Sequence, residues 1–161
     1  MANSAVQLEF KETKSPPISR RHWESKKLVD VRCEVWTVRN LIDYMPQLFL
    51  DDSFQVAETR WKLPDQQGYI TSLVQGFAQS AFSFGEMDAT PELGKKYHEQ
   101  ILKGYADLII DANNRKETLF AFANNEFTWD AEGYTNGPQF FKDLPESLQN
   151  YILDQNINVH R

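Results

Sequence analysis

The chain has few of the residues that build metal centres and cross-links. Its 161 residues include one cysteine, Cys33, and three histidines, His22, His98 and His160. A single cysteine excludes an intramolecular disulfide and a cysteine-built zinc site, and it suits a reducing cytosol. No two histidines have metal-ligand spacing, so the clustered His and Asn of an HNH-type nuclease are missing. Cys33 also lacks a clear His partner, and we expect it to be a small buried apolar residue and not a nucleophile.

Long hydrophobic runs are absent as well. The longest, such as Leu108–Ile109–Ile110, fall far below the roughly 20 residues that a membrane span needs. The N-terminal residues lack an apolar stretch long enough for a secretory signal. We therefore expect a soluble, cytoplasmic protein with no membrane partner.

Core-forming residues are plentiful. Hydrophobic residues make up 41% of the chain and aromatic residues 13%, which excludes a disordered or low-complexity protein. A chain of this length buries about 70% of the surface that its unfolded form exposes, enough for one domain with a core of its own. We divide the sequence into a flexible N-terminal arm, residues 1–25, and a folded domain, residues 26–161.

Charge is unevenly distributed. The net charge is −6, yet residues 11–39 hold eight Lys/Arg against four Asp/Glu. The cluster Arg20, Arg21, Lys26 and Lys27 could contact phosphates, so DNA binding through residues 11–39 is one hypothesis. A solvated arm is the interpretation we favour, because the rest of the chain is acidic.

Hydrophobic periodicity predicts helices alternating with short strands, and hence a mixed α/β or α+β domain. Thr37 caps a helix that Pro46 ends, and a second helix begins near Pro64 with Ile70, Leu73, Val74 and Phe77 on one face. Further helices are predicted at 91–103, 113–123 and 146–153. Strands or extended segments are predicted at 31–38, 49–56, 81–84, 105–110, 127–129 and 157–159.

The segment 108–115, Leu-Ile-Ile-Asp-Ala-Asn-Asn-Arg, is the most informative. A buried strand delivers Asp111, Asn113, Asn114 and Arg115 into the first turn of a helix. Free N–H groups and the helix dipole favour an anion there, and an arginine suits phosphate. On spacing alone we favour a simpler arrangement, in which Asp111 caps the helix and Arg115 pairs with it at i,i+4.

This segment resembles the Asp-Gly-Gln-Gln-Arg signature of the N-terminal domain of GmrSD-type restriction endonucleases, in the ParB/sulfiredoxin-like superfamily. The matching residues are Asp111, Arg115, Thr118, Leu119 and Phe122. Similarity continues in order over most of 30–160, through Phe54-Gln55, Arg60-Trp61, the helix 67–76 and the closing segment 143–159. Ala112 stands where the signature has glycine, and Val56 where arginine is usual.

The resemblance implies an α+β, ParB/sulfiredoxin-like domain with a small mixed sheet and packed helices. It implies binding of a nucleoside triphosphate of unknown base, with Mg²⁺, in a restriction or anti-phage system. Asp111 and Arg115 would be catalytic if the chain hydrolyses the nucleotide, with Asp111 at the metal. The nucleotide would contact Gln55, Arg60, Asn113, Asn114, Arg115 and Thr118, and Trp61 either stacks on the base or belongs to the core.

The sequence does not decide between several partners and activities. The resemblance implies an HNH-type nuclease domain or subunit as a partner, and a homo-oligomer is also allowed. Ala112 and Val56 favour an alternative in which the pocket has decayed and the domain is a non-catalytic regulator or adaptor. A DNA-sensing domain that works with a nuclease is a further alternative.

Overall fold

A computed structural model describes residues 31–51, 60–77 and 80–161. The described part is an α+β fold with a five-stranded mixed sheet, as predicted. The strands are β1 Cys33–Thr37, β2 Leu48–Phe49, β3 Phe82–Glu86, β4 Asp107–Asp111 and β5 Asn156–His160. The helices are α2 Val38–Tyr44, α3 Leu63–Val74, α4 Pro91–Lys96, α5 His98–Leu102, α6 Asn113–Ala123 and α7 Glu146–Leu153, with 3₁₀ turns η1 Met45–Gln47 and η2 Phe141–Asp143. The predicted arm 1–25, the extended residues Phe54 and Val56, and Gln55 lie outside the described residues.

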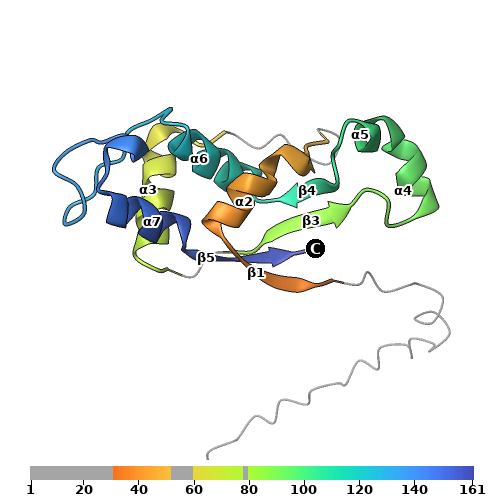
Figure 1. Cartoon of the computed structure of the whole chain (residues 1–161), viewed down its shortest axis with the longest axis horizontal. Helices are drawn as coiled ribbons and strands as arrows, with labels where there is room; N and C mark the ends of the chain where they lie inside the picture. The colour runs from red at the N-terminus through yellow and green to blue at the C-terminus, as the bar shows by residue number, and fades with distance from the viewer. Residues whose placement is uncertain (1–30, 52–59, 78–79) are drawn as a thin grey trace, which may run out of the picture. The chain divides into compact units, whose positions relative to one another are not determined.

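The sheet has the strand order β1-β5-β3-β4-β2. β5 runs antiparallel to β1 and parallel to β3, while β4 runs antiparallel to β3 and parallel to β2. Helices α2 and α6 lie over one face of this sheet, and α4 with α5 lies beyond the end of β3 (Figure 1). Within the described part, no helix is long and apolar enough to cross a membrane.

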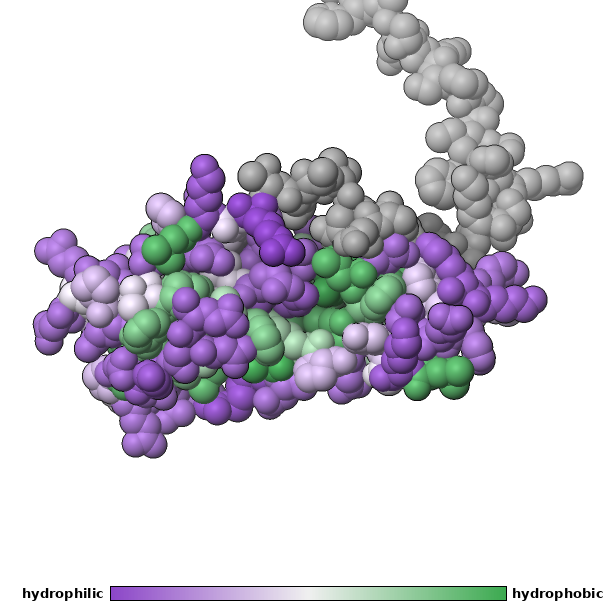
Figure 2. Space-filling view, turned by 90° about the horizontal axis from the view of Figure 1, so that it is seen from above, coloured by the Kyte–Doolittle hydropathy of each residue, from purple (hydrophilic) through white to green (hydrophobic). Residues whose placement is uncertain are grey.

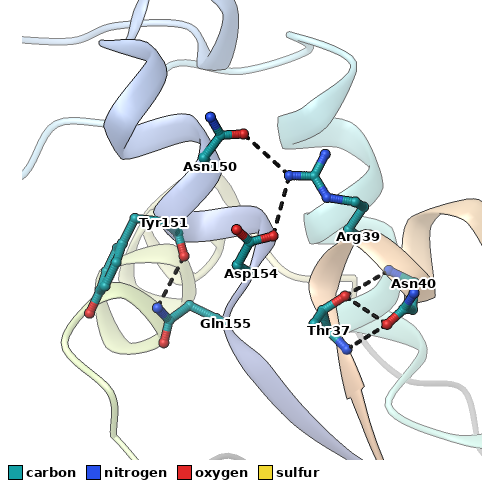
Figure 3. A network of polar contacts seen from close by, with 7 residues as sticks. All are labelled: Thr37, Arg39, Asn40, Asn150, Tyr151, Asp154 and Gln155. Atoms are coloured by element: carbon teal, nitrogen blue, oxygen red, sulfur yellow. Dashed lines mark hydrogen bonds and ion pairs between the residues drawn. The ribbon is translucent and has the colours of Figure 1, made fainter.

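Local sequence explains the junction of β1 with α2. Thr37 Oγ1 accepts a hydrogen bond from the Asn40 N–H, and Asn40 Oδ1 accepts one from the Thr37 N–H, each at 3.1 Å. This reciprocal capping stabilises the first turn. The Arg39 guanidinium donates hydrogen bonds to Asn150 in α7 and to Asp154 just after α7, at 3.3 Å each. These polar contacts join α2 to α7 (Figure 3).

The core lies between the helices and the covered face of the sheet. α3 contributes Ile70, Leu73 and Val74, as its periodicity predicted, and all three are buried. α6 contributes Leu119 and Phe122, whose ring packs 6.2 Å from the fully buried Trp129. Strand β5 contributes Ile157 and Val159, which are buried and lie on the same face of the strand.

Several predicted details are wrong, and most of the errors concern which side chains are buried. Cys33 is exposed because β1 is an edge strand whose inward side chains are Glu34 and Trp36. Phe77 lies beyond the end of α3 and is 63% exposed, since Gly76 turns the chain with φ 72°. Ile110 is 58% exposed because the second half of β4 leaves the core.

Two predicted elements differ from the structure by more than a shift of their ends. The helix expected at 91–103 divides at Tyr97 into α4 and α5. The strand expected at 127–129 is reduced to a single bridge between Trp129 and Gln139. In both places an anchored aromatic side chain sets the backbone path, because Tyr97 and Trp129 are buried.

Candidate functional site

The turn between β4 and α6 has an unusual backbone. Ala112 is the N-cap residue of α6 and adopts φ 78°, the left-handed region that favours glycine. The signature that this segment resembles has glycine at this position, whereas this chain adopts the positive φ with an alanine. The Ala112 methyl is buried in the core, which offsets part of the cost of this conformation.

Helix α6 begins without a side-chain cap. Asp111 was expected to cap it, but Asp111 Oδ1 instead accepts a hydrogen bond from the Ala112 N–H, at 2.6 Å. The Asp111 side chain is 61% exposed. The N-terminal end of the helix therefore presents the positive end of its dipole next to an accessible carboxylate.

Arg115 connects α6 to the residues that enter β3. Its guanidinium donates to the Ser80 carbonyl and, at 3.1 Å, to the Ala81 carbonyl, and it lies 5.0 Å from the centre of the Phe82 ring. The predicted i,i+4 ion pair with Asp111 is present at 3.7 Å. Because only 12% of the Arg115 side chain is exposed, its first role is to position the chain around this turn.

The two asparagines of the first turn differ in their surroundings. Asn113 Oδ1 is buried and has no hydrogen-bond partner in residues 31–51, 60–77 and 80–161. Asn114 Oδ1 accepts a hydrogen bond from the backbone N–H of Trp61 at 3.3 Å, and this bond joins the segment before α3 to the start of α6. Asn113 is thus the asparagine with an unused acceptor.

Thr118 does not reach the surface. It is 0% exposed, and its hydroxyl donates to the Asn114 carbonyl at 2.8 Å. Direct contact with a nucleotide, as expected from the resemblance, does not fit this burial. Thr118 instead holds the first turn of α6 from within the core.

Arg60 and Trp61 precede α3. Arg60 is exposed, whereas Trp61 is half-buried and packs against the core, with its ring 5.5 Å from that of Tyr69. The structure shows the core interpretation of Trp61 in part, since its half-buried ring packs inward, and stacking on a base stays a prediction. Gln55, the other residue predicted on this side, lies outside the described residues.

Tyr69 is a residue that sequence analysis missed. It is 6% exposed, and its buried hydroxyl has no hydrogen-bond partner among the residues that the structure describes. Burial raises its pKa to about 12, and the positive charge of Arg115 opposes that shift. This electrostatic effect connects the Tyr69 hydroxyl with the β4–α6 turn, and periodicity, which marks Tyr69 only as a helix residue, gives no signal for it.

A groove of about 620 Å³ lies along α3. It is lined by Trp61, Pro64, Asp65, Gly68, Tyr69, Ser72 and Phe77. The groove is shallow and open to solvent, and Trp61 and Phe77 provide its accessible aromatic surface. Apolar patches between polar side chains are visible on the helix-bearing side of the molecule (Figure 2).

A second polar cluster lies at the opposite end of β4. Asp107 is 0% exposed, and its Oδ2 accepts from the Tyr44 hydroxyl at 2.5 Å and lies 3.0 Å from Arg161 Nε. Arg161 also donates to the Tyr44 hydroxyl at 3.1 Å. Burial, followed by the hydrogen bond to Asp107, raises the Tyr44 pKa above its usual value. These contacts join α2, β4 and the residue after β5, while Asp107 Oδ1 has no hydrogen-bond partner among the described residues.

Comparison of the chain with protein-family models, curated proteins and solved structures finds no match.

Proposed function

We propose that this domain binds a nucleoside triphosphate at the start of α6. The observation that carries the proposal is the uncapped N-terminus of α6, which follows the left-handed Ala112 and lies beside Asp111 and Arg115. Helix N-termini of this kind bind phosphate through backbone N–H groups and the helix dipole. The ordered resemblance to the ParB/sulfiredoxin-like domain of GmrSD-type enzymes supports the same assignment.

Buried polar atoms without partners support a ligand next to this turn. Within the described part of the chain, Asn113 Oδ1 and the Tyr69 hydroxyl are buried and have no hydrogen-bond partner, and each such group costs about 1–3 kcal/mol if it stays so. A ribose or base that supplied hydrogen bonds to them would recover part of that cost. The accessible part of Trp61, in the groove along α3, provides a surface for stacking a base.

Asp111 is the residue that fits Mg²⁺. Its carboxylate is 61% exposed, whereas the described residues contain no group of three or more His, Cys, Asp or Glu side chains that could hold a metal. One carboxylate suits Mg²⁺ when phosphate oxygens and water complete the coordination. Mg²⁺ would neutralise phosphate charge there, while Arg60 is an exposed cation for a further phosphate contact.

Binding is supported more directly than hydrolysis. In the proposed reaction Asp111 orients the metal or an attacking water, and Arg115 stabilises charge on the transferred phosphoryl group. Two of the Arg115 donors are already bonded to the carbonyls of Ser80 and Ala81. The same bonds favour the second candidate, a regulatory or adaptor domain whose pocket no longer binds nucleotide and which contacts a nuclease or another protein.

Calorimetric titration with ATP, GTP, CTP and UTP, with and without Mg²⁺, tests the proposal. One base should bind best, and Asn113→Ala should weaken that binding about tenfold, because it removes one hydrogen-bonding group. Lys95→Ala, on the exposed side of α4, is the matched control and should bind like the wild type. If none of the four nucleotides binds, the adaptor alternative is favoured.

A further inference from the structure

The outer edge of β1 has a regular pattern of backbone groups. Arg32 and Arg161 exchange two backbone hydrogen bonds, at 2.7 and 2.9 Å, so the polar backbone groups of Arg32 point toward β5. Orientation alternates along an antiparallel strand, so those of Val31, Cys33 and Val35 point away from the sheet. β1 is the first strand in the sheet order, and within the described residues it pairs with β5 alone.

The side chains of this edge are also arranged for contact. Val31 and Val35 are 55% and 66% exposed, and Cys33 between them is exposed on the same face. Arg32 and Glu34 alternate with them, so the opposite face has one charge of each sign. An edge strand with exposed apolar side chains is a template for another strand.

We propose that a second copy of this chain pairs antiparallel along β1, with Cys33 opposite Cys33 at the two-fold axis. This pairing continues the sheet across the dimer, and it does not rest on the proposed nucleotide site. Val31 then faces Val35 of the second copy, and Arg32 faces Glu34 of the second copy. Each opposed pair occurs twice, as an isologous interface requires.

Charge selects this register among the symmetric ones. Outward backbone groups can pair when Cys33, Glu34 or Val35 lies at the axis, and equally when Arg32 does. An axis at Glu34 opposes two carboxylates, and an axis at Arg32 opposes two guanidinium groups. With Val35 at the axis, Glu34 would face Trp36, so only the Cys33 register opposes Arg32 to Glu34.

Reciprocal charge reversal is the sharpest test. Arg32→Glu makes both charged positions acidic, and Glu34→Arg makes both basic, so each variant should self-associate about tenfold more weakly in sedimentation velocity. When the two variants are mixed, every opposed pair has opposite signs, and native mass spectrometry should show the heterodimer in excess over both homodimers. A purely structural role of either side chain would not restore association on mixing.

Cys33 provides a test of the register. In a hydrogen-bonded antiparallel pair the two Cα atoms lie about 5.5 Å apart, within disulfide range. Oxidation of the full chain with copper–phenanthroline should therefore trap a dimer that a reductant releases. A mixture of V31C/C33S with C33S/V35C should give the mixed disulfide, whereas C33S/N158C, whose cysteine lies one strand inward, should remain monomeric on a non-reducing gel.

A fold-neutral substitution completes the test. Val35→Lys places a charge on the edge and should abolish the dimer, whereas Ile110→Lys, at an exposed apolar position on β4, should leave it intact. Circular dichroism should show both variants folded. A wild-type chain that stays monomeric at every concentration, or a dimer unaffected by Val35→Lys and by the charge variants, would overturn the proposal.

Discussion

The two ends of strand β4 each carry an aspartate, and the two are used in opposite ways. Asp107 is 0% exposed and is bound by Tyr44 and Arg161, while Asp111 is 61% exposed and pairs loosely with Arg115. The Asp107 cluster has a buried carboxylate at its centre and joins α2, β4 and the residue after β5. The second aspartate remains accessible and precedes Asn113, whose Oδ1 has no hydrogen-bond partner among the described residues.

This difference separates stability from function along one strand. A buried charge is tolerated only when its partners are in place, so the Asp107 cluster acts as a fixed structural unit. The Asp111 turn differs in having an exposed carboxylate and, at Ala112, a backbone residue in the left-handed region. Backbone strain concentrates at functional sites and an exposed carboxylate is accessible to a ligand, so we place the ligand at Asp111 and not at the buried Asp107.

The largest expected effect is removal of the buried carboxylate. Asp107→Ala leaves Tyr44 and Arg161 without their shared partner and should lower the free energy of unfolding by about 3 kcal/mol. Asp111→Ala, the matched change at the other end of β4, should cost less than about 1 kcal/mol because that ion pair is exposed. Denaturant titration of both variants measures the contrast, and equal costs would refute it.

Arg115 is the next most sensitive position. Arg115→Ala removes donors to the carbonyls of Ser80 and Ala81 and should cost about 2 kcal/mol of stability. Arg115→Lys should recover only part of it, since one ammonium cannot match a planar fork that spans two carbonyls. Arg39→Ala, an arginine with 45% exposure, is the control and should cost less than about 1 kcal/mol in the same denaturant titration.

Sequence analysis predicted elements better than it predicted burial. The bounds of α6 were predicted correctly because a buried strand, a polar first turn and two core residues, Leu119 and Phe122, occur in that order. The exposed Cys33 was predicted wrongly, because alternation along β1 gives two faces but does not say which one meets the helices. That choice depends on the neighbouring strand β5, which is distant in sequence.

The candidate site was predictable to the same extent. Asp111 and Arg115 were paired from their i,i+4 spacing, and the structure confirms that contact. The bonds of Arg115 to Ser80 and Ala81, and the unpaired hydroxyl of Tyr69, could not be inferred, because they depend on how α3 and β3 pack against α6. Sequence spacing reports neighbours on one helix and is silent on neighbours from another.

Ala112 should tolerate a substitution that other positions in α6 do not. Ala112→Gly relieves a left-handed conformation worth about 1 kcal/mol but removes a buried methyl of similar value, so stability should change by less than about 0.5 kcal/mol. Ala121→Gly, inside the same helix, should cost about 1 kcal/mol. Thermal unfolding of the pair tests this, and similar losses in both would mean that Ala112 is not strained.

The smallest effect on stability at neutral pH is expected for a substitution of Tyr69. Tyr69→Phe removes a buried hydroxyl that has no partner, so stability at pH 7 should be unchanged or rise by up to about 1 kcal/mol. Tyr44→Phe, by contrast, breaks the hydrogen bond to Asp107 and should destabilise the fold.

The loss of stability at alkaline pH distinguishes Tyr69 from Tyr44 further. The Tyr69 pKa is raised from 10.0 to about 12 in the folded state, so its contribution to stability is complete below pH 10 and is lost as the pH rises toward 12. Tyr69→Phe should flatten this loss, and the part that remains should come from Tyr44 and Tyr97, whose pKa values are raised as well. Denaturant midpoints measured from pH 8 to about pH 11 give both slopes. If Tyr69→Phe also weakens nucleotide binding while the fold becomes no less stable, the hydroxyl serves the ligand, because no group among the described residues bonds to it.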